Sequence, residues 1–173
     1  GLASTEVSIT AINSAAPSIT TDGGSWLGTD GTGTAGTWNQ SNVWSSGVSG
    51  DDGVTPVSRG FDGQLNTYMA APKDATLTWN ASGFSALSGA VRLYVYRRPE
   101  VLYTINGGSQ VPTAATDSGE GWVDLGTVAS IQSITLTGTG GNGTAWFALE
   151  VNGRILVDTG VTGAPGETFV TGP

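Results

Sequence analysis

The side chains of this chain that could do chemistry are carboxylates and aromatic rings, because its 173 residues include no histidine and no cysteine. Their absence removes the commonest general base, the thiol nucleophile and most zinc ligands. Hydrolysis of a glycoside needs two converging carboxylates, and the sequence shows no such pair among the strand-region and loop acids Glu100, Asp117, Glu120 and Asp124. We therefore expect a protein that is not an enzyme.

Aromatic side chains indicate a different chemistry, the binding of sugars. In residues 91–96, aliphatic side chains alternate with Arg92, Tyr94 and Tyr96, which would lie together on the outer face of a strand. Aromatic faces stack on sugar CH groups while polar neighbours hold the hydroxyls, so these three residues and the loop residue Trp44 are candidate glycan contacts. A cross-strand ladder or a subunit contact is the alternative for the three strand residues.

The remaining tryptophans divide between loops and strands. Trp26 and Trp38 lie in loop-like segments and join the glycan candidates. Trp79, Trp122 and Trp146 lie in alternating strand patterns, so we expect these three side chains in the core.

One segment, residues 144–158, predicts a β-hairpin around which the fold is organised. Its centre is Asn152-Gly153, the pair that suits a type I′ turn, where both central residues have φ > 0. Strict alternation would place Trp146, Ala148 and Glu150 on one face and Phe147, Leu149 and Val151 on the other. As the densest apolar stretch of the chain, the hairpin should lie at the centre of a sheet.

Further strands are predicted at short intervals along the rest of the chain. A second Asn-Gly turn, Asn106-Gly107, should join two strands, and Pro112 marks the second of these as an edge strand. Other alternating segments cover residues 76–79, 91–96, 121–125 and 131–137, and no stretch has helical periodicity over three turns. The pattern predicts an all-β protein, an antiparallel β-sandwich or jelly roll.

Two of these motifs carry a resemblance to known families. Phe61-Asp62-Gly63, followed by Thr67, resembles the Asp-Gly turn of discoidin-type (coagulation factor 5/8 C domain) and family 32 carbohydrate-binding jelly rolls, and residues 147–153 resemble their closing strand. The order of motifs over residues 37–160 also resembles a module recurrent in structural proteins of marine cyanophages. This resemblance implies a non-enzymatic protein on the virion surface, as a capsid decoration or a tail-fibre component.

The discoidin-type resemblance also implies a structural calcium ion at the Asp-Gly turn. Asp62 and Thr67 would supply oxygen ligands, and the closing strand of the family usually adds a glutamate. This chain has Ala148 at that position and Glu150 two residues later. The alternative is that Asp62 caps its own turn through backbone N–H groups. No other cofactor is expected.

Composition limits the partners of the chain. The net charge is −8 and charged residues make up only 12%, which is typical of extracellular and virion proteins. We therefore expect no binding to nucleic acid or to anionic membranes, and no apolar run is long enough to span a membrane. The expected partners are other virion proteins and further copies of this chain. In the alternative, the protein is an adhesin that binds cell-surface glycan.

The chain divides by composition into three parts. Residues 1–36 read as an extended N-terminal arm that ends in a Gly/Thr-rich linker, with an ordinary first strand of the sandwich as the alternative. Residues 37–160 form the sandwich, and residues 161–173 a Gly/Pro-rich tail. Since the chain begins without methionine, we expect a processed product, a tagged protein or a fragment such as one repeat of a longer fibre.

Overall fold

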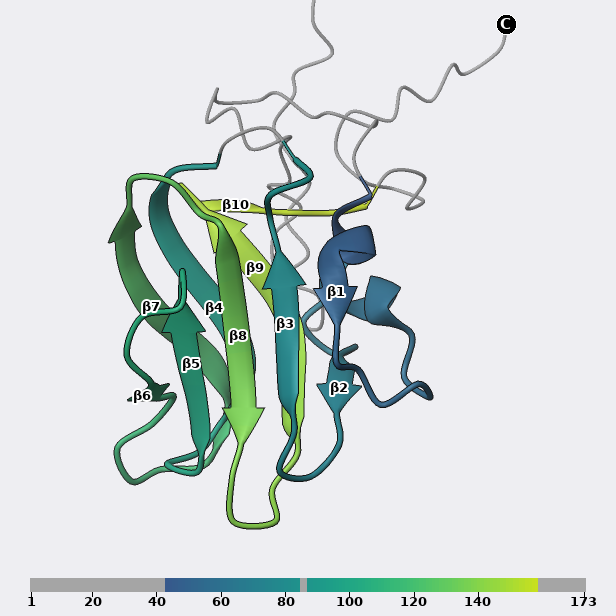
Figure 1. The fold of residues 1–173 in the computed structure, drawn as a ribbon, viewed down its shortest axis with the longest axis vertical. Helices are drawn as coiled ribbons and strands as arrows, with labels where there is room; N and C mark the ends of the chain where they lie inside the picture. Colours follow the sequence, from purple (N-terminus) through teal and green to yellow (C-terminus); the bar gives the residue numbers. More distant parts are fainter. Residues whose placement is uncertain (1–42, 85–86, 159–173) are drawn as a thin grey trace, which may run out of the picture.

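The computed structural model describes residues 43–84 and 87–158, which form two antiparallel sheets packed face to face (Figure 1). The first sheet has the order β1-β3-β8-β5-β6, with bounds Val48–Ser49, Thr76–Asn80, Ser133–Gly138, Val101–Ile105 and Val111–Pro112. The second has the order β10-β9-β4-β7, with bounds Arg154–Ile155, Thr144–Val151, Gly89–Arg97 and Gly119–Val128, and β2 (Met69–Ala71) also pairs with β9. The predicted all-β antiparallel sandwich is confirmed.

Two 3₁₀ helices, η1 (Trp44–Gly47) and η2 (Val57–Phe61), connect the segments before β2. Each contributes an aromatic residue to the core, Trp44 and Phe61, both with no exposed surface. Among the described residues, no helix is long and apolar enough to cross a membrane.

The core lies between the two sheets and follows the period-2 alternation of the strands. Leu77 and Trp79 on β3 face Leu93 on β4 and Leu149 on β9 across the sandwich, and all four are completely buried. Phe61 packs between the two sheets, with its ring centroid 5.8 Å from that of Trp79 and 6.1 Å from that of Trp146. Burial of each such side chain contributes about 1.5–3 kcal/mol, so these rings hold the sheets together.

The predicted hairpin at residues 144–158 is present, and its first strand, β9, lies inside the sheet. Asn152 and Gly153 both have positive φ, 51° and 76°, as a type I′ turn requires. The returning strand β10 is short and pairs with Glu150 and Val151.

One detail of the predicted hairpin is wrong. Leu149, Val151 and Trp146 all face the core, although strict alternation would put Trp146 opposite to the other two. The register along β4 shifts between Tyr94, which is opposite Ala148, and Val95, which is opposite Trp146. Phe147 is therefore the extra residue of a β-bulge, which reverses the alternation before it.

The second Asn-Gly hairpin is also confirmed. Asn106 and Gly107 have φ of 51° and 68° and join β5 to β6, and β6, which contains Pro112, is an edge strand as predicted. The expected arm (residues 1–36) and tail (residues 161–173) lie outside the described residues.

Candidate functional site

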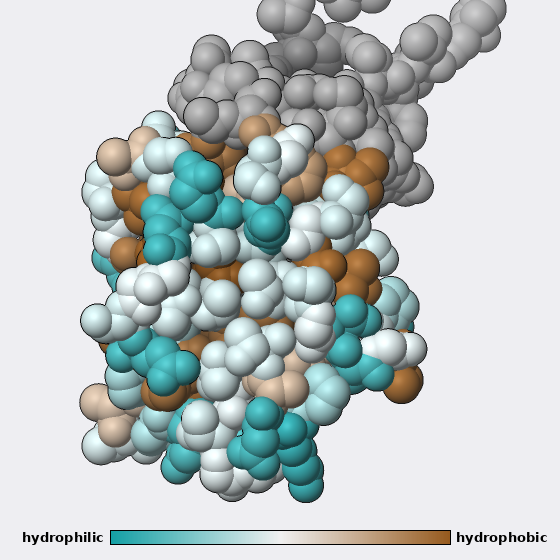
Figure 2. Space-filling view, in the orientation of Figure 1, coloured by the Kyte–Doolittle hydropathy of each residue, from teal (hydrophilic) through white to brown (hydrophobic). Residues whose placement is uncertain are grey.

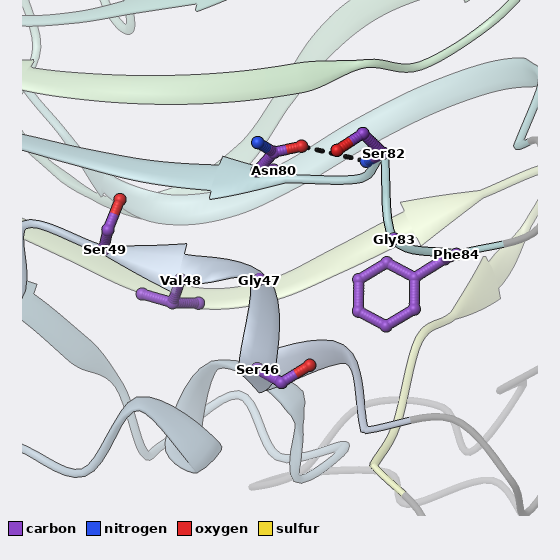
Figure 3. Close-up of a pocket in the computed structure, with 8 residues that line it drawn as sticks. All are labelled: Ser46, Gly47, Val48, Ser49, Asn80, Ser82, Gly83 and Phe84. Atoms are coloured by element: carbon purple, nitrogen blue, oxygen red, sulfur yellow. Dashed lines mark hydrogen bonds between the residues drawn. The ribbon is translucent and has the colours of Figure 1, made fainter.

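An open pocket of about 390 Å³, lined by both polar and apolar groups, lies at the end of β3, where β1 and the turn after β3 meet (Figure 3). Three segments contribute to it: the end of η1, strand β1, and the end of β3 with its following turn. The described residues that line it are Ser46, Gly47, Val48, Ser49, Asn80, Ser82, Gly83 and Phe84. A volume of this size lies in the range of small-ligand sites.

The turn after β3 is fixed by short-range hydrogen bonds. The side-chain oxygen of Asn80 accepts a bond from the Ser82 N–H at 2.9 Å, and the Phe84 N–H donates to the carbonyl oxygen of Ala81 at 3.0 Å. This Asx-type turn reverses the chain and returns Phe84 toward η1.

The close approach of η1 and β1 to β3 depends on a glycine. A Cβ atom on Gly47 would lie 2.4 Å from the backbone oxygen of Asn80 and 3.2 Å from the ring of Phe84. Side chains larger than hydrogen would therefore push these segments apart and open the pocket.

An aromatic cluster holds the ring of Phe84 in place at the pocket wall. Phe84 lies at 4.9 Å from the ring of Trp44 and stacks at 6.0 Å on Trp79, with an interplanar angle of 16°. The Trp79 indole N–H donates to the backbone oxygen of Trp44 at 2.9 Å, which ties the two tryptophans together. Phe84 itself is half-buried, so it offers a rigid, partly exposed apolar surface to the pocket.

Apart from Phe84, Val48 and the two glycines, the lining of the pocket is polar but uncharged. Its polar groups are the hydroxyls of Ser46, Ser49 and Ser82 and the amide of Asn80, while no lining residue is titratable. Hydroxyls and amides both donate and accept hydrogen bonds. The pocket is therefore suited to a neutral ligand with several hydroxyl groups and an apolar face.

The strand residues proposed from the sequence as glycan contacts lie on the other sheet. Arg92, Tyr94 and Tyr96 share the outer face of β4, as predicted, and each is half-buried. Tyr94 contacts rings of both neighbouring strands, edge-on to Trp122 on β7 at 5.2 Å and to Phe147 on β9 at 5.5 Å. Tyr94 thus takes part in a cross-strand ladder, which is the alternative interpretation of this face.

The guanidinium groups on this face are already paired. Arg92 donates two hydrogen bonds of 2.7 Å to the Glu150 carboxylate and lies 4.5 Å above the ring of Trp122. The bond to Glu150 raises the pKa of Arg92 above its ordinary value. Arg98 covers the ring of Tyr96 in the same way, at 4.6 Å. A ligand would have to displace these cations to stack on either ring.

Among the tryptophans, two predictions need correction. Trp44 has no exposed surface, because it packs beneath Phe84, and so it cannot contact a glycan from solvent. Trp122, expected in the core, is half-buried on the outer face, because its neighbour Val123 occupies the inward position opposite Leu93. Trp79 and Trp146 are completely buried, as predicted. Trp26 and Trp38 lie outside the described residues.

The Asp62 turn is closed by its own hydrogen bonds. One carboxylate oxygen of Asp62 accepts the Gln64 N–H at 2.9 Å, and the other accepts the Thr67 hydroxyl at 2.5 Å. Burial raises the pKa of Asp62 above its ordinary value. The predicted cap of the turn is confirmed.

The donors for calcium do not fit the expected set. Ala148 has no side-chain oxygen, and both oxygens of Glu150 are bonded to Arg92. Within residues 43–84 and 87–158, no three histidine, cysteine, aspartate or glutamate side chains come close enough to hold a metal ion. Calcium therefore enters no step of the function proposed below.

Sequence reasoning did not identify the pocket residues Asn80, Ser82 and Phe84. The signal was an asparagine at a strand end, two residues before a Ser-Gly pair and an aromatic residue, which predicts an Asx turn with a ring behind it. The contributions of Ser46 and Ser49 had no such signal, because the pairing of β1 with β3 brings Ser49, and η1 just before it, to the end of β3.

Comparison with known proteins gives matches to solved structures alone, since no family model and no curated protein matches the chain. One is the CBM32-4 module produced by Clostridium perfringens, in complex with glcNAc-alpha-1,4-galactose, at 18% identity and a TM-score of 0.45, covering 64% of this chain and 94% of that one. The family 32 module of C. perfringens NanJ, in complex with galactose, matches at 18% identity and a TM-score of 0.40, and the match covers 63% of this chain and 96% of that one. The chitosan-binding module 1 from a Paenibacillus sp. IK-5 chitosanase/glucanase matches at 18% identity and a TM-score of 0.40, and the match covers 60% of this chain and 90% of that one. At such TM-scores these likenesses carry no argument about this chain.

Proposed function

We propose that this protein is a non-catalytic carbohydrate-binding module whose pocket beside β1 and β3 holds an uncharged sugar. The observation that carries the proposal is the combination of one half-exposed ring, Phe84, with a lining of hydroxyl and amide groups and no charged side chain. A sugar has the matching chemistry, because its CH groups form an apolar face and its hydroxyls donate and accept hydrogen bonds.

Two features indicate that the pocket is a binding site and not merely a hollow in the surface. Trp44 and Trp79 pack against the ring of Phe84 and hold it in place. Because this side chain is already ordered, little side-chain entropy is lost when a ligand stacks on it. The turn that carries Ser82 is likewise held by the Asn80 side chain before any ligand arrives.

The lining also supports a binding role without catalysis. Cleavage of a glycoside in most families uses a pair of carboxylates on either side of the scissile bond. None of the residues that line this pocket is an acid. A sugar held there would meet hydrogen-bonding groups and an aromatic ring, but no general acid or base.

The test is binding to an array of neutral glycans, followed by calorimetry on the sugars that bind. Gly83→Leu should fill the pocket, since nothing lies within 4 Å of the position of a Cβ atom there, and Phe84→Ala should remove the ring. We expect each to weaken binding at least about tenfold, the value of one aromatic contact. Tryptophan fluorescence provides an independent signal, because Trp79 stacks on Phe84.

The double variant Tyr94→Ala, Tyr96→Ala is the matched control on the opposite sheet. It should bind sugar like the unmodified protein, provided that its thermal unfolding shows it to be folded. If this variant loses binding while the two pocket variants keep it, the site lies on the outer face of β4. If no neutral glycan binds at all, the proposed function is wrong.

Attachment to a virus particle stays a prediction that rests on the sequence resemblance. The test of this prediction is to measure the copy number of this chain in purified particles, relative to the major capsid protein, by quantitative mass spectrometry. A ratio approaching one would support a decoration protein, and a ratio of a few per cent a fibre or an adhesin. Deletion of residues 1–36 tests the arm, since unchanged particle association would exclude a docking role for it.

A further inference from the structure

Beside the pocket, four threonines form a square on the outer face of the first sheet. Strand β3 carries Thr76 and Thr78, strand β8 carries Thr135 and Thr137, and a leucine that faces the core separates the two threonines of each strand. In the antiparallel register Thr76 is opposite Thr137 and Thr78 is opposite Thr135. We call these four residues the threonine face.

Three of the four hydroxyls of the threonine face are held by bonds to a neighbouring threonine. Those of Thr76 and Thr137 lie 2.8 Å apart, and those of Thr135 and Thr104 on β5 lie 2.7 Å apart. A bond between two hydroxyls uses one proton and one lone-pair site, and so leaves a second proton and further lone pairs for a ligand. The bonds fix the positions of the Thr76, Thr135 and Thr137 hydroxyls without exhausting them.

No charge interrupts this surface. The outward positions that continue the square are Ser49 on β1, opposite Thr78, and the pair of Asn80 and Ser133 at the end of β3 and β8. In Figure 2, which views the molecule from the side of β3 and β8, the middle of this face is pale, and the strongly hydrophilic residues lie toward its margins. In a chain with a net charge of −8, an uncharged sheet face is a distinct region of the surface.

The threonine face is continuous with the pocket. Ser49 and Asn80 line the pocket and also belong to the outward rows of the sheet, beside Thr78. From Asn80 to Thr76 the strand advances four residues, a distance of about 13 Å. A chain of sugars that entered the pocket could leave it directly onto the hydroxyls of the threonine face.

We propose that the ligand is a linear, uncharged polysaccharide, one residue of which occupies the pocket while the following residues lie along the threonine face. This inference rests on the proposed function, because it assumes that the pocket holds a sugar. It adds the length and the charge of the ligand. Each hydroxyl contact would replace a contact with water and contributes little alone, so the gain comes from several residues of one chain acting together.

The experiment measures affinity as a function of ligand length. The probes are the oligosaccharides of xylan, of galactomannan and of laminarin, from the monosaccharide to the hexasaccharide, with calorimetry on the full chain. For at least one series, we expect the hexasaccharide to bind at least about tenfold tighter than the monosaccharide, equal to about 1.4 kcal/mol. An equal affinity for all lengths would overturn the inference and leave the pocket proposal intact.

Three variants connect the gain with the threonine face. Thr78→Val with Thr135→Val keeps the branched shape that suits a strand but removes the two central hydroxyls, so it should lose the gain with length and retain monosaccharide affinity. Thr78→Ser with Thr135→Ser restores the hydroxyls and should restore the gain. Thr127→Val, an exposed position on β7 of the other sheet, is the control and should bind every length like the unmodified protein.

The outcomes separate the two proposals. If the valine variant binds the hexasaccharide as tightly as the unmodified protein, the threonine face does not contact the ligand. If no neutral glycan of the array binds, the proposed function fails and this inference fails with it; if a sugar binds but no series gains affinity with length, this inference alone fails.

Discussion

At the scale of single residues, Asp158 is a buried carboxylate whose protonation should change the stability. Its carboxylate accepts bonds from the N–H and the hydroxyl of Ser45, 113 residues away, and only 5% of the residue is exposed. Burial raises the pKa of Asp158 above the ordinary value of 3.8, and the charge of Asp62 raises it further. The folded protein thus holds this proton more tightly than the unfolded chain does.

The sign of the pH effect follows from that difference. The contribution of Asp158 to the free energy of unfolding is largest below pH 3.8 and is lost as the pH rises through the raised value. Asp158→Asn removes this titration. We therefore expect urea unfolding to show the unmodified protein gaining stability relative to the variant as the pH falls from about 7 toward 4. A constant difference between the two proteins over that range would contradict the assignment.

At the scale of the elements, the contact of β1 with β3 depends on the glycine before it. Gly47→Ala would place a methyl group 2.4 Å from the backbone oxygen of Asn80, which cannot rotate away. We expect a loss of about 1–3 kcal/mol in the free energy of unfolding, together with weaker sugar binding, because the strands must separate.

Gly83→Ala, on the neighbouring turn, is the matched control for that variant. Its added methyl group meets nothing within 4 Å, so thermal or urea unfolding should change by less than about 0.5 kcal/mol. Equal losses for the two alanine variants would mean that the close approach at Gly47 is not what the fold requires.

The elements also show what the sequence can and cannot predict. Both Asn-Gly turns and the alternation in β4 could be predicted from the sequence, because each follows from a local pattern of few residues. The bulge at Phe147 depends on the register between β9 and β4, and the outward position of Trp122 on the register between β7 and β4. Register is set by pairing with a distant strand, so an isolated segment does not reveal it.

The same limit applies to the site at the scale of the whole molecule. The pocket joins residues 46–49 to residues 80–84, and the threonine face adds a strand more than 50 positions later in the chain. Each of these segments alone reads as an ordinary polar loop or a strand with threonines on its solvent side. The two sheets divide the outer surface into a neutral side with the pocket and a side with paired charges, Arg92 with Glu150.

That division predicts how salt should affect binding. Sugar held by the pocket and the threonine face would meet no charged group of those surfaces, so its affinity should stay constant between about 0.01 and 0.5 M NaCl, a range that shortens the Debye length several-fold. Acidic polymers such as polygalacturonate should bind weakly or not at all, because the net charge of −8 repels them. Calorimetry at each salt concentration, with one neutral and one acidic polymer, makes the comparison. An affinity for the neutral polymer that falls steeply with salt would mean that charged side chains such as Arg92 or Arg98 contact the ligand, and the site would then belong to the opposite sheet.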